Sequence, residues 1–312
     1  MKIWLIGAGY MATEYSKVLD ALNSEYLVIG RGQNSAKSFE NKTDKNVFIG
    51  GVSLALEKLD VPQFAIVATG VDSLASTAKS LIEAGVESIL IEKPGGVNLR
   101  EIESIANLSN KMSCKVLLGY NRRFYSSTIS AIDLIEKDGG ARSFTFDFTE
   151  WSHVIRPLEK NKVIKESWFI SNSSHVADLA FFLGGFPIEI NSLNRGSLDW
   201  HSSSSIFCGS GITEKNALFS YVANWSSPGR WSLELMTDKR RLIFRPLEEL
   251  REIKHGSLEE YKISPKDDLD ITFKPGVYRM VDSFLQKDES LFCSIEDQLE
   301  HFALYCAIAG YD

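Results

Sequence analysis

The chain is poor in cysteine and proline and has no excess of basic residues. Only 4 of its 312 residues are cysteine, with no CxxC pair and no spacing suited to zinc, so we expect buried free thiols and no metal site. Acidic residues outnumber basic ones by 41 to 34, and the net charge of −7 argues against a general nucleic-acid binder. No apolar run approaches the length of a membrane span, and the N-terminus has no signal-peptide pattern. We therefore expect a cytoplasmic protein with neither nucleic-acid nor membrane partners.

Residues 1–120 alternate between apolar runs and stretches of helical periodicity. Near-continuous apolar strands separated by helices are typical of a parallel sheet covered on both faces. Asn98 with Glu101 three residues later predicts the capped start of one helix. The pattern predicts an α/β fold whose first domain, residues 1–120, is a doubly wound nucleotide-binding domain. The expected strands are Ile3–Ile6, Tyr26–Ile29, Val47–Ile49, Phe64–Ala68, Ser88–Ile91 and Val116–Leu118.

The pattern changes after residue 120 to alternation with period two. This predicts a second domain, residues 121–312, of the α+β type with a large, mainly antiparallel sheet for substrate binding and oligomerisation. Two helices, about 276–287 and 295–309, are expected to end it. Aromatic residues are numerous enough to occupy both faces of this sheet, which predicts a homodimer or homotetramer formed through it. The aromatics in question are Phe144, Phe146, Phe148, Trp225 and Trp231.

A short glycine pattern, Gly7-Ala-Gly9-Tyr-Met-Ala12, stands between the first expected strand and a helix. Gly7 permits the tight turn out of the strand, Gly9 lets the backbone approach a pyrophosphate, and Ala12 lets the helix pack closely on the sheet. The helix N-terminus would then hold the pyrophosphate. The alternative is a tight strand-to-helix turn without a ligand. The flanking strand and helix favour a dinucleotide site.

The second expected strand is followed by Arg31, Asn34 and Ser35, with no acidic residue at its end. An acid at this position would hold the ribose 2′-hydroxyl of NAD, whereas an arginine accommodates the 2′-phosphate of NADP. Arg31 could instead be a solvated turn residue. The pattern favours NADP, with NAD as the alternative.

Four segments form a further pattern: the glycine pattern at 7–12, Glu92-Lys93-Pro94, Gly119-Tyr-Asn-Arg-Arg-Phe124 and His175-Val-Ala-Asp178. Together they resemble the Gfo/Idh/MocA oxidoreductases, the glucose–fructose and inositol dehydrogenase-like enzymes. The resemblance is dense over residues 1–125 and thin over residues 126–312. It implies a hydride transfer between nicotinamide C4 and a carbinol or carbonyl carbon of a sugar, polyol or sugar nucleotide.

The resemblance also implies roles for individual residues. Lys93 would stabilise charge on the reacting oxygen or take its proton, and His175 would exchange a proton with the substrate hydroxyl. A cis peptide before Pro94 would be usual for such a protein. The implied cofactor contacts are Gly7, Gly9, Tyr10, Met11, Ala12, Arg31, Ala68, Thr69, Glu92, Lys93 and Asn121.

The segment before His175 departs from the family pattern. An aspartate is common four residues before this histidine, where this chain has Ser171, and the stretch 167–174 is expected to be shortened. Asn172 and the nearby serines would then contact the substrate, with Asp178 and Arg123 as further candidates. Two other functions remain open: a cofactor-binding regulator without catalytic activity, and a reductase of a substrate that is not a sugar.

Overall fold

The computed structural model describes residues 2–311 and divides them into two compact units. The first holds the described residues up to Asn121 together with Leu269–Phe302, and the second holds Arg122–Asp268 together with the residues from Ala303 onward. This division differs from the single boundary expected at residue 120. The segment 269–302 lies in the first unit because it contributes a strand to that unit's sheet and a helix to its surface.

A seven-stranded sheet forms the centre of the first unit. Its strand order is β15-β6-β5-β4-β1-β2-β3, and every pairing is parallel except that of β15 with β6. Strands β1, β4 and β5 are buried throughout, which explains their continuous apolar sequences. The strands are β1 (Ile3–Ile6), β2 (Tyr26–Gly30), β3 (Val47–Ile49), β4 (Phe64–Val67), β5 (Ser88–Ile91), β6 (Lys115–Leu118) and β15 (Cys293–Ser294).

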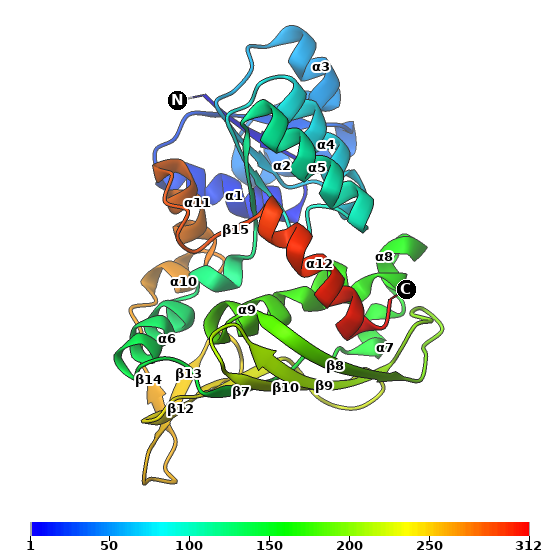
Figure 1. Cartoon of the computed structure of the whole chain (residues 1–312). Coiled ribbons are helices and arrows are strands. Elements are labelled where there is room, and N and C mark those ends of the chain that lie inside the picture. The colour runs from blue at the N-terminus through cyan, green and yellow to red at the C-terminus, as the bar shows by residue number, and fades with distance from the viewer. Residues whose placement is uncertain (1, 312) are drawn as a thin grey trace. The chain divides into compact units, whose positions relative to one another are not determined.

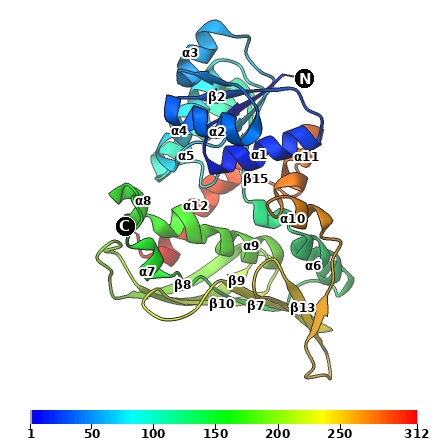
Figure 2. The same ribbon diagram turned by 180° about the vertical axis from the view of Figure 1, so that it is seen from behind.

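Helices cover both faces of this sheet, as expected for a doubly wound fold. Helices α1, α2 and α11 pack together on one face, and α3, α4 and α5 pack together on the other (Figures 1 and 2). The predicted cap is confirmed, since Asn98 Oδ1 accepts a hydrogen bond of 3.0 Å from the Glu101 amide. The helices are α1 (Tyr10–Ala21), α2 (Gln33–Thr43), α3 (Gly51–Lys58), α4 (Val71–Glu83), α5 (Leu99–Met112), α10 (Asp268–Thr272), α11 (Val277–Gln286) and α12 (Ile295–Ala309).

An eight-stranded sheet forms the centre of the second unit. Its order is β14-β13-β12-β11-β7-β10-β9-β8, and all pairings are antiparallel except that of β7 with β10. The predicted class, a doubly wound sheet followed by a mainly antiparallel one, is therefore confirmed. The strands are β7 (Ser143–Asp147), β8 (Pro187–Arg195), β9 (Ile206–Thr213), β10 (Leu218–Asn224), β11 (Ser232–Met236), β12 (Arg240–Phe244), β13 (Leu250–Lys254) and β14 (Tyr261–Ile263).

Helices cover one face of this second sheet (Figures 1 and 2). Helix α9 packs on β7 and β11, and its Phe181 contacts Phe144 and Phe146 edge-on at ring distances of 6.0 and 5.5 Å. The helical segments of this unit are η1 (Asn121–Phe124), α6 (Ser126–Lys137), α7 (Ser152–Ile155), α8 (Lys162–Glu166), η2 (Phe169–Ser173), α9 (Ser174–Gly184) and the end of α12.

The expectation that aromatic residues occupy both sheet faces was wrong. Phe144, Phe146, Phe148, Trp225 and Trp231 are all buried, with exposed fractions of 0–6%. The three phenylalanines alternate along one strand and its end, so they point to the same face, where α9 and the neighbouring loops cover them. The opposite face instead carries exposed aliphatic residues between small polar ones, including Leu193, Ile206, Leu218 and Val222.

Candidate active site

The glycine turn after β1 requires glycine at its first position. Gly7 has a φ of +121°, and a Cβ atom there would lie 2.3 Å from the Ala68 carbonyl oxygen. Its amide donates a 2.9 Å hydrogen bond to Ile29 O, so the turn is tied to the neighbouring strand. Ala12 is fully buried, as expected for a small residue between helix and sheet. The turn therefore brings strands β1, β2 and β4 together at their carboxyl ends.

The N-terminus of α1 is open. Gly9 precedes the helix, and a Cβ atom at this position would meet nothing within 4 Å. The first helical turn has no acidic side chain, so its free amides and the helix dipole are available to an anion. Tyr10 is 67% exposed beside this turn, and Met11 is half-buried. This space fits the pyrophosphate of a dinucleotide.

The end of β4 adds a second feature that fits a cofactor. Ala68 and Thr69 follow the strand, and the Thr69 amide lies 3.4 Å from the position a Gly7 Cβ would take. Within residues 2–311, the buried Thr69 hydroxyl has no hydrogen-bond partner. A buried hydroxyl without a partner is costly, and a bound ligand would satisfy it.

Arg31 stands between the starts of two helices. It is exposed, and it directly precedes Gly32, which caps α2. Its side chain also lies beside Gly51, the first residue of α3, where an added Cβ would be 3.9 Å from Arg31 Cβ. Two helix N-termini and a guanidinium are all favourable to an anion.

The Glu92-Lys93-Pro94 segment follows β5 at the same edge of the sheet. The Lys93–Pro94 peptide is cis, as the resemblance implied, and Lys93 is only 9% exposed. Glu92 accepts a 2.7 Å hydrogen bond from the Tyr15 hydroxyl. Burial of Tyr15, together with the Glu92 charge, raises the tyrosine pKa well above its usual value, so the phenol stays a donor. The hydrogen bond from Tyr15 therefore holds Glu92 on the sheet, and Lys93 follows it directly.

Helix α12 holds this segment through hydrogen bonds of one side chain, Gln298. Gln298 is fully buried, and its amide nitrogen donates to Pro94 O at 3.3 Å while its oxygen accepts from Tyr120 at 3.1 Å. Asn121, the residue after Tyr120, donates from its side-chain amide to Pro275 O at 2.9 Å. The predicted cofactor residue Asn121 is thus held by the segment that returns to the first unit.

His175 lies in the second unit, as the second residue of α9, and is 7% exposed. The segment before it forms the π-helical turn η2. Such turns widen a helix by one residue and are frequent at functional sites. Ser171 lies in this turn, is 8% exposed, and has its hydroxyl 3.4 Å from that of Ser167.

A carboxylate that the sequence analysis missed supports this turn. Glu150 is 2% exposed, and its Oε1 accepts hydrogen bonds of 2.7 Å from both Asn172 Nδ2 and Ser173 Oγ. Its Oε2 accepts a 2.9 Å hydrogen bond from Arg230. An acid from beyond β7 therefore lies next to the segment where the family's usual aspartate is missing.

A tryptophan and an arginine near His175 were also not recognised as site residues from the sequence. The ring of Trp231 lies 6.5 Å from that of His175, and the Arg230 guanidinium lies 4.4 Å from the Trp231 ring. Both residues precede β11 and follow the Ser227-Pro228-Gly229 turn. In the sequence, Trp231 was noted only as a sheet aromatic, and no local pattern connects residues 150, 175 and 230.

Arg123 and Asp178, two candidate substrate residues, are paired with each other. Arg123 donates two hydrogen bonds to the Asp178 carboxylate, at 2.9 and 2.6 Å, and the exposed fractions are 4% and 0%. The guanidinium also lies 4.6 Å from the Phe182 ring. This buried, bidentate pair fixes α9 against η1.

The parallel strand order, the glycine turn and the open helix N-terminus define a dinucleotide-binding domain. A family comparison then makes the class specific. Residues 1–120 match the Gfo/Idh/MocA model, described as an oxidoreductase family with an NAD-binding Rossmann fold. The resemblance predicted from the sequence is confirmed for this part of the chain.

Solved structures share the fold over nearly the whole chain. A putative NADPH-dependent oxidoreductase from Desulfitobacterium hafniense is 15% identical with a TM-score of 0.81, covering 99% of this chain and 94% of the other. UDP-N-acetylglucosamine 3-dehydrogenase from Acidithiobacillus ferrooxidans is 15% identical, with a TM-score of 0.75 and coverage of 99% and 96%. Levoglucosan dehydrogenase, solved with NADH and levoglucosan, is 16% identical, with a TM-score of 0.78 and coverage of 99% and 96%. No curated protein matches the sequence.

Residues 2–311 contain no group of three or more His, Cys, Asp or Glu side chains arranged to hold a metal ion. In the same part of the chain, no helix is both long and apolar enough to cross a membrane.

Proposed function

We propose that this protein is an NAD(P)-dependent oxidoreductase that acts on a hydroxyl or carbonyl carbon of a sugar, polyol or sugar nucleotide. The main support is the edge of the first sheet. An open glycine turn follows β1, an unsatisfied Thr69 hydroxyl follows β4, and Glu92-Lys93 follows β5, the next strand in the order β5-β4-β1. Sugar-acting dehydrogenases among the solved structures with this fold add support for the substrate class.

The proposed cofactor is NADP, with its 2′-phosphate bound by Arg31. The position of Arg31 beside the starts of α2 and α3, without a carboxylate at the end of β2, supports this choice over NAD. The pyrophosphate would lie on the α1 N-terminus at Gly9, and Thr69 would meet the bound cofactor. When bound, the nicotinamide supplies or accepts the hydride.

The proposed catalytic residues are Lys93 and His175. A buried ammonium stabilises negative charge on a reacting oxygen far better than a solvated one. The imidazole would exchange the hydroxyl proton. Asn172 and Ser171 remain candidates for substrate contact, whereas the buried pairing of Arg123 with Asp178 favours a positioning role for both.

The bare face of the second sheet supports a homo-oligomer. Leu193 and Val222 both flank Cys208 on neighbouring strands, and they are 64% and 50% exposed. Leu218 is 62% exposed on the same face. A second copy of the chain on this face would bury these side chains, and a two-fold axis is the commonest symmetry for such pairing. We propose a dimer, or a tetramer built from such dimers.

The test of this function is a nicotinamide absorbance assay of the purified protein with polyols, sugars and sugar nucleotides. We expect oxidation or reduction of NADP(H) with at least one of these classes. Binding of NADP(H) without turnover of any of them would instead support the regulator. Turnover confined to carbonyl compounds that are not sugars would support the alternative reductase.

A further inference from the structure

Arg230 is held in place on three sides yet remains half-exposed. Its guanidinium lies 4.4 Å from the Trp231 ring and 5.2 Å from the Trp151 ring. Its Nη1 donates to the buried carboxylate of Glu150 at 2.9 Å. The side chain is nevertheless 47% exposed, whereas that of Glu150 is 2% exposed. Such a guanidinium has lost most of its conformational freedom before any ligand binds.

Arg230 needs only one of its N–H groups for Glu150. Asn172 and Ser173 donate to Oε1 of this buried carboxylate, and Arg230 donates to Oε2 through Nη1. A guanidinium has five N–H donors, and within the described residues a single one is recorded in a hydrogen bond for Arg230. The other donors, on an immobilised and half-exposed group, suit a planar or tetrahedral anion.

The neighbouring tryptophan provides an independent sign of a ligand. Trp231 is 6% exposed, and its indole Nε1 is buried without a hydrogen-bond partner in the described part of the chain. A buried donor of this kind is usually satisfied, and a ligand oxygen would satisfy it. Trp231 lies between Arg230 and His175, with its ring 6.5 Å from the imidazole.

A cavity within the second unit reaches Glu150, to which Arg230 donates, and Gly229, which precedes Arg230; Arg230 and Trp231 themselves do not line it. It has a volume of about 580 Å³ and is lined by Glu150, Trp151, His153, Arg156 and the Ser226–Gly229 turn, among others. Trp151 is 48% exposed, and its indole donates to Gly229 O at 2.8 Å, directly before Arg230. This open space begins at the hydrogen-bond partner and the chain neighbour of Arg230.

We infer that the substrate carries an anionic group, a carboxylate or a phosphate, which Arg230 and Trp231 bind next to the hydroxyl addressed by His175. The substrate class is then an acidic sugar, such as a uronate, a sugar phosphate or a sugar nucleotide. This inference rests on the proposed function for the identity of the reacting hydroxyl. The anion site itself does not depend on turnover.

The experiment measures binding by calorimetry, in the presence of saturating NADP(H), of four probes: glucose, glucuronate, glucose 6-phosphate and UDP-N-acetylglucosamine. We expect at least one anionic probe to bind at least tenfold more tightly than glucose, with an affinity that falls as salt is raised. Arg230→Gln should remove this preference, and Arg230→Lys should restore only part of it. The probe preferred distinguishes a carboxylate from a phosphate.

The matched control is Arg251→Gln. Arg251 is another partly exposed arginine of the same unit, held by Glu249 and Glu260, and its loss should leave the preference intact. Equal affinity for all four probes, binding of none of them, or a preference that survives Arg230→Gln would overturn the inference. If the preference is lost in Arg230→Gln but the wild type never changes nicotinamide absorbance, the anion site stands and the proposed function fails.

Discussion

The two units place their candidate residues in different ways. In the first unit, the residues follow directly on strands β1, β2, β4 and β5, which are neighbours in a parallel sheet. In the second unit, Glu150, the stretch that holds Asn172 and His175, and Arg230 with Trp231 come from three separate parts of the chain, which meet through side chains. The first arrangement is dictated by backbone geometry, so short motifs reveal it. The second depends on tertiary folding, so its members are not recognisable from local sequence.

The strongest test of this contrast is Lys93→Ala in the first unit. Charge stabilisation at a reacting oxygen is worth about a hundred- to a thousandfold, so kcat should fall by about that factor. Cofactor affinity should stay within several-fold, because the proposed phosphate contacts lie at the glycine turn instead. Steady-state kinetics and cofactor titration measure the two effects, with the exposed Lys115→Ala as the control. Undiminished turnover in Lys93→Ala would disprove the assigned role.

The corresponding test in the second unit is His175→Ala. We expect kcat to fall by a smaller factor, about ten to a thousand, and the pH profile to shift, because the proposed proton-exchanging group is gone. His255→Ala, at an exposed position, should change neither. Retained activity with an unchanged pH profile would shift the proton route to Ser171, Asn172 or water, and would leave Lys93 as the sole catalytic side chain.

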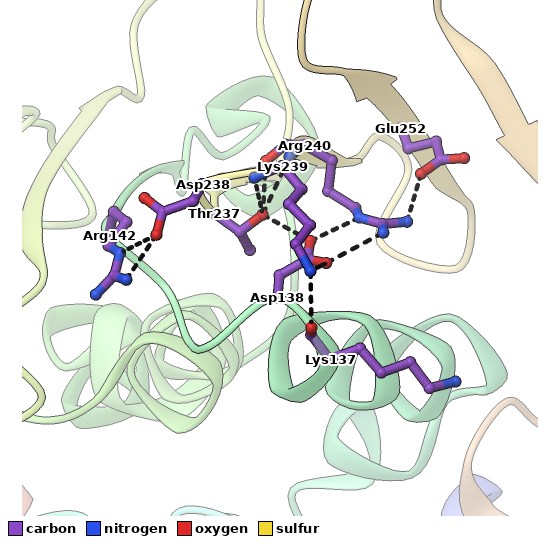
Figure 3. Close-up of polar contacts among 8 residues, drawn as sticks. All are labelled: Lys137, Asp138, Arg142, Thr237, Asp238, Lys239, Arg240 and Glu252. Atoms are coloured by element: carbon purple, nitrogen blue, oxygen red, sulfur yellow. Dashed lines mark hydrogen bonds and ion pairs between the residues drawn. The ribbon is translucent and has the colours of Figure 1, made fainter.

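A second carboxylate cluster in the same unit, built around Asp138, should affect stability but not kinetics. Asp138 is 6% exposed and accepts hydrogen bonds from Arg240 and Thr237 (Figure 3). Burial disfavours its charged form, but these hydrogen bonds and the charges of Arg240 and Lys239 outweigh burial and lower its pKa. We expect Asp138→Asn to reduce the free energy of unfolding by about 1.5–3 kcal/mol at pH 7.

The pH dependence of that loss has a definite sign. A carboxyl group with a lowered pKa in the folded state stabilises the fold above its unfolded pKa of about 4, and this contribution is lost as the pH falls through the folded value. The difference in the free energy of unfolding between wild type and Asp138→Asn, measured by urea unfolding, should therefore be constant from pH 7 to 5 and shrink below pH 4. The exposed Asp238→Asn, whose partner is Arg142, serves as the control and should change stability little. A difference in the free energy of unfolding that grows as the pH falls would contradict this.

Arg31→Asp tests the cofactor choice in the first unit. The change removes a phosphate partner and places a carboxylate where the 2′-phosphate would lie. NADP(H) affinity should fall at least tenfold, about 1.4 kcal/mol, with a much smaller effect on NAD(H). Fluorescence titration with both cofactors measures this. An equal loss for both, or a wild type that prefers NAD, would refute the assignment.

The smallest expected kinetic effect comes from the bare sheet face. Leu218→Asp places a charge among the exposed aliphatic residues, so the proposed oligomer should dissociate to monomers in light scattering. Lys254→Asp, at an exposed position of β13, is the control for an added acid. A wild type that is already monomeric at micromolar concentration would rule the oligomer out.

Sequence reasoning succeeded where structure is local. The six strands of residues 1–120 are observed within about a residue of the expected bounds, and Asn98 caps its helix as predicted. It failed for the sheet aromatics, because alternation shows that Phe144 and Phe146 share a face but not what covers that face. The segment 269–302 was also expected in the second domain. Its link to the first unit is the pairing of β15 with β6, and a two-residue strand that pairs with a distant part of the chain leaves no recognisable sequence pattern.

The π-helical turn η2 has a consequence for how this segment tolerates change. Each residue of a regular α-helix advances the chain by about 100°, so a turn with one residue more rotates everything on one side relative to the other. Deleting a single residue from Phe169–Ser173 would let the segment run straight into α9 as an ordinary helix. The backbone would gain regular hydrogen bonds, while Asn172 or Ser173 would lose its place against Glu150. In this stretch, a shorter chain would make a better helix and a worse site.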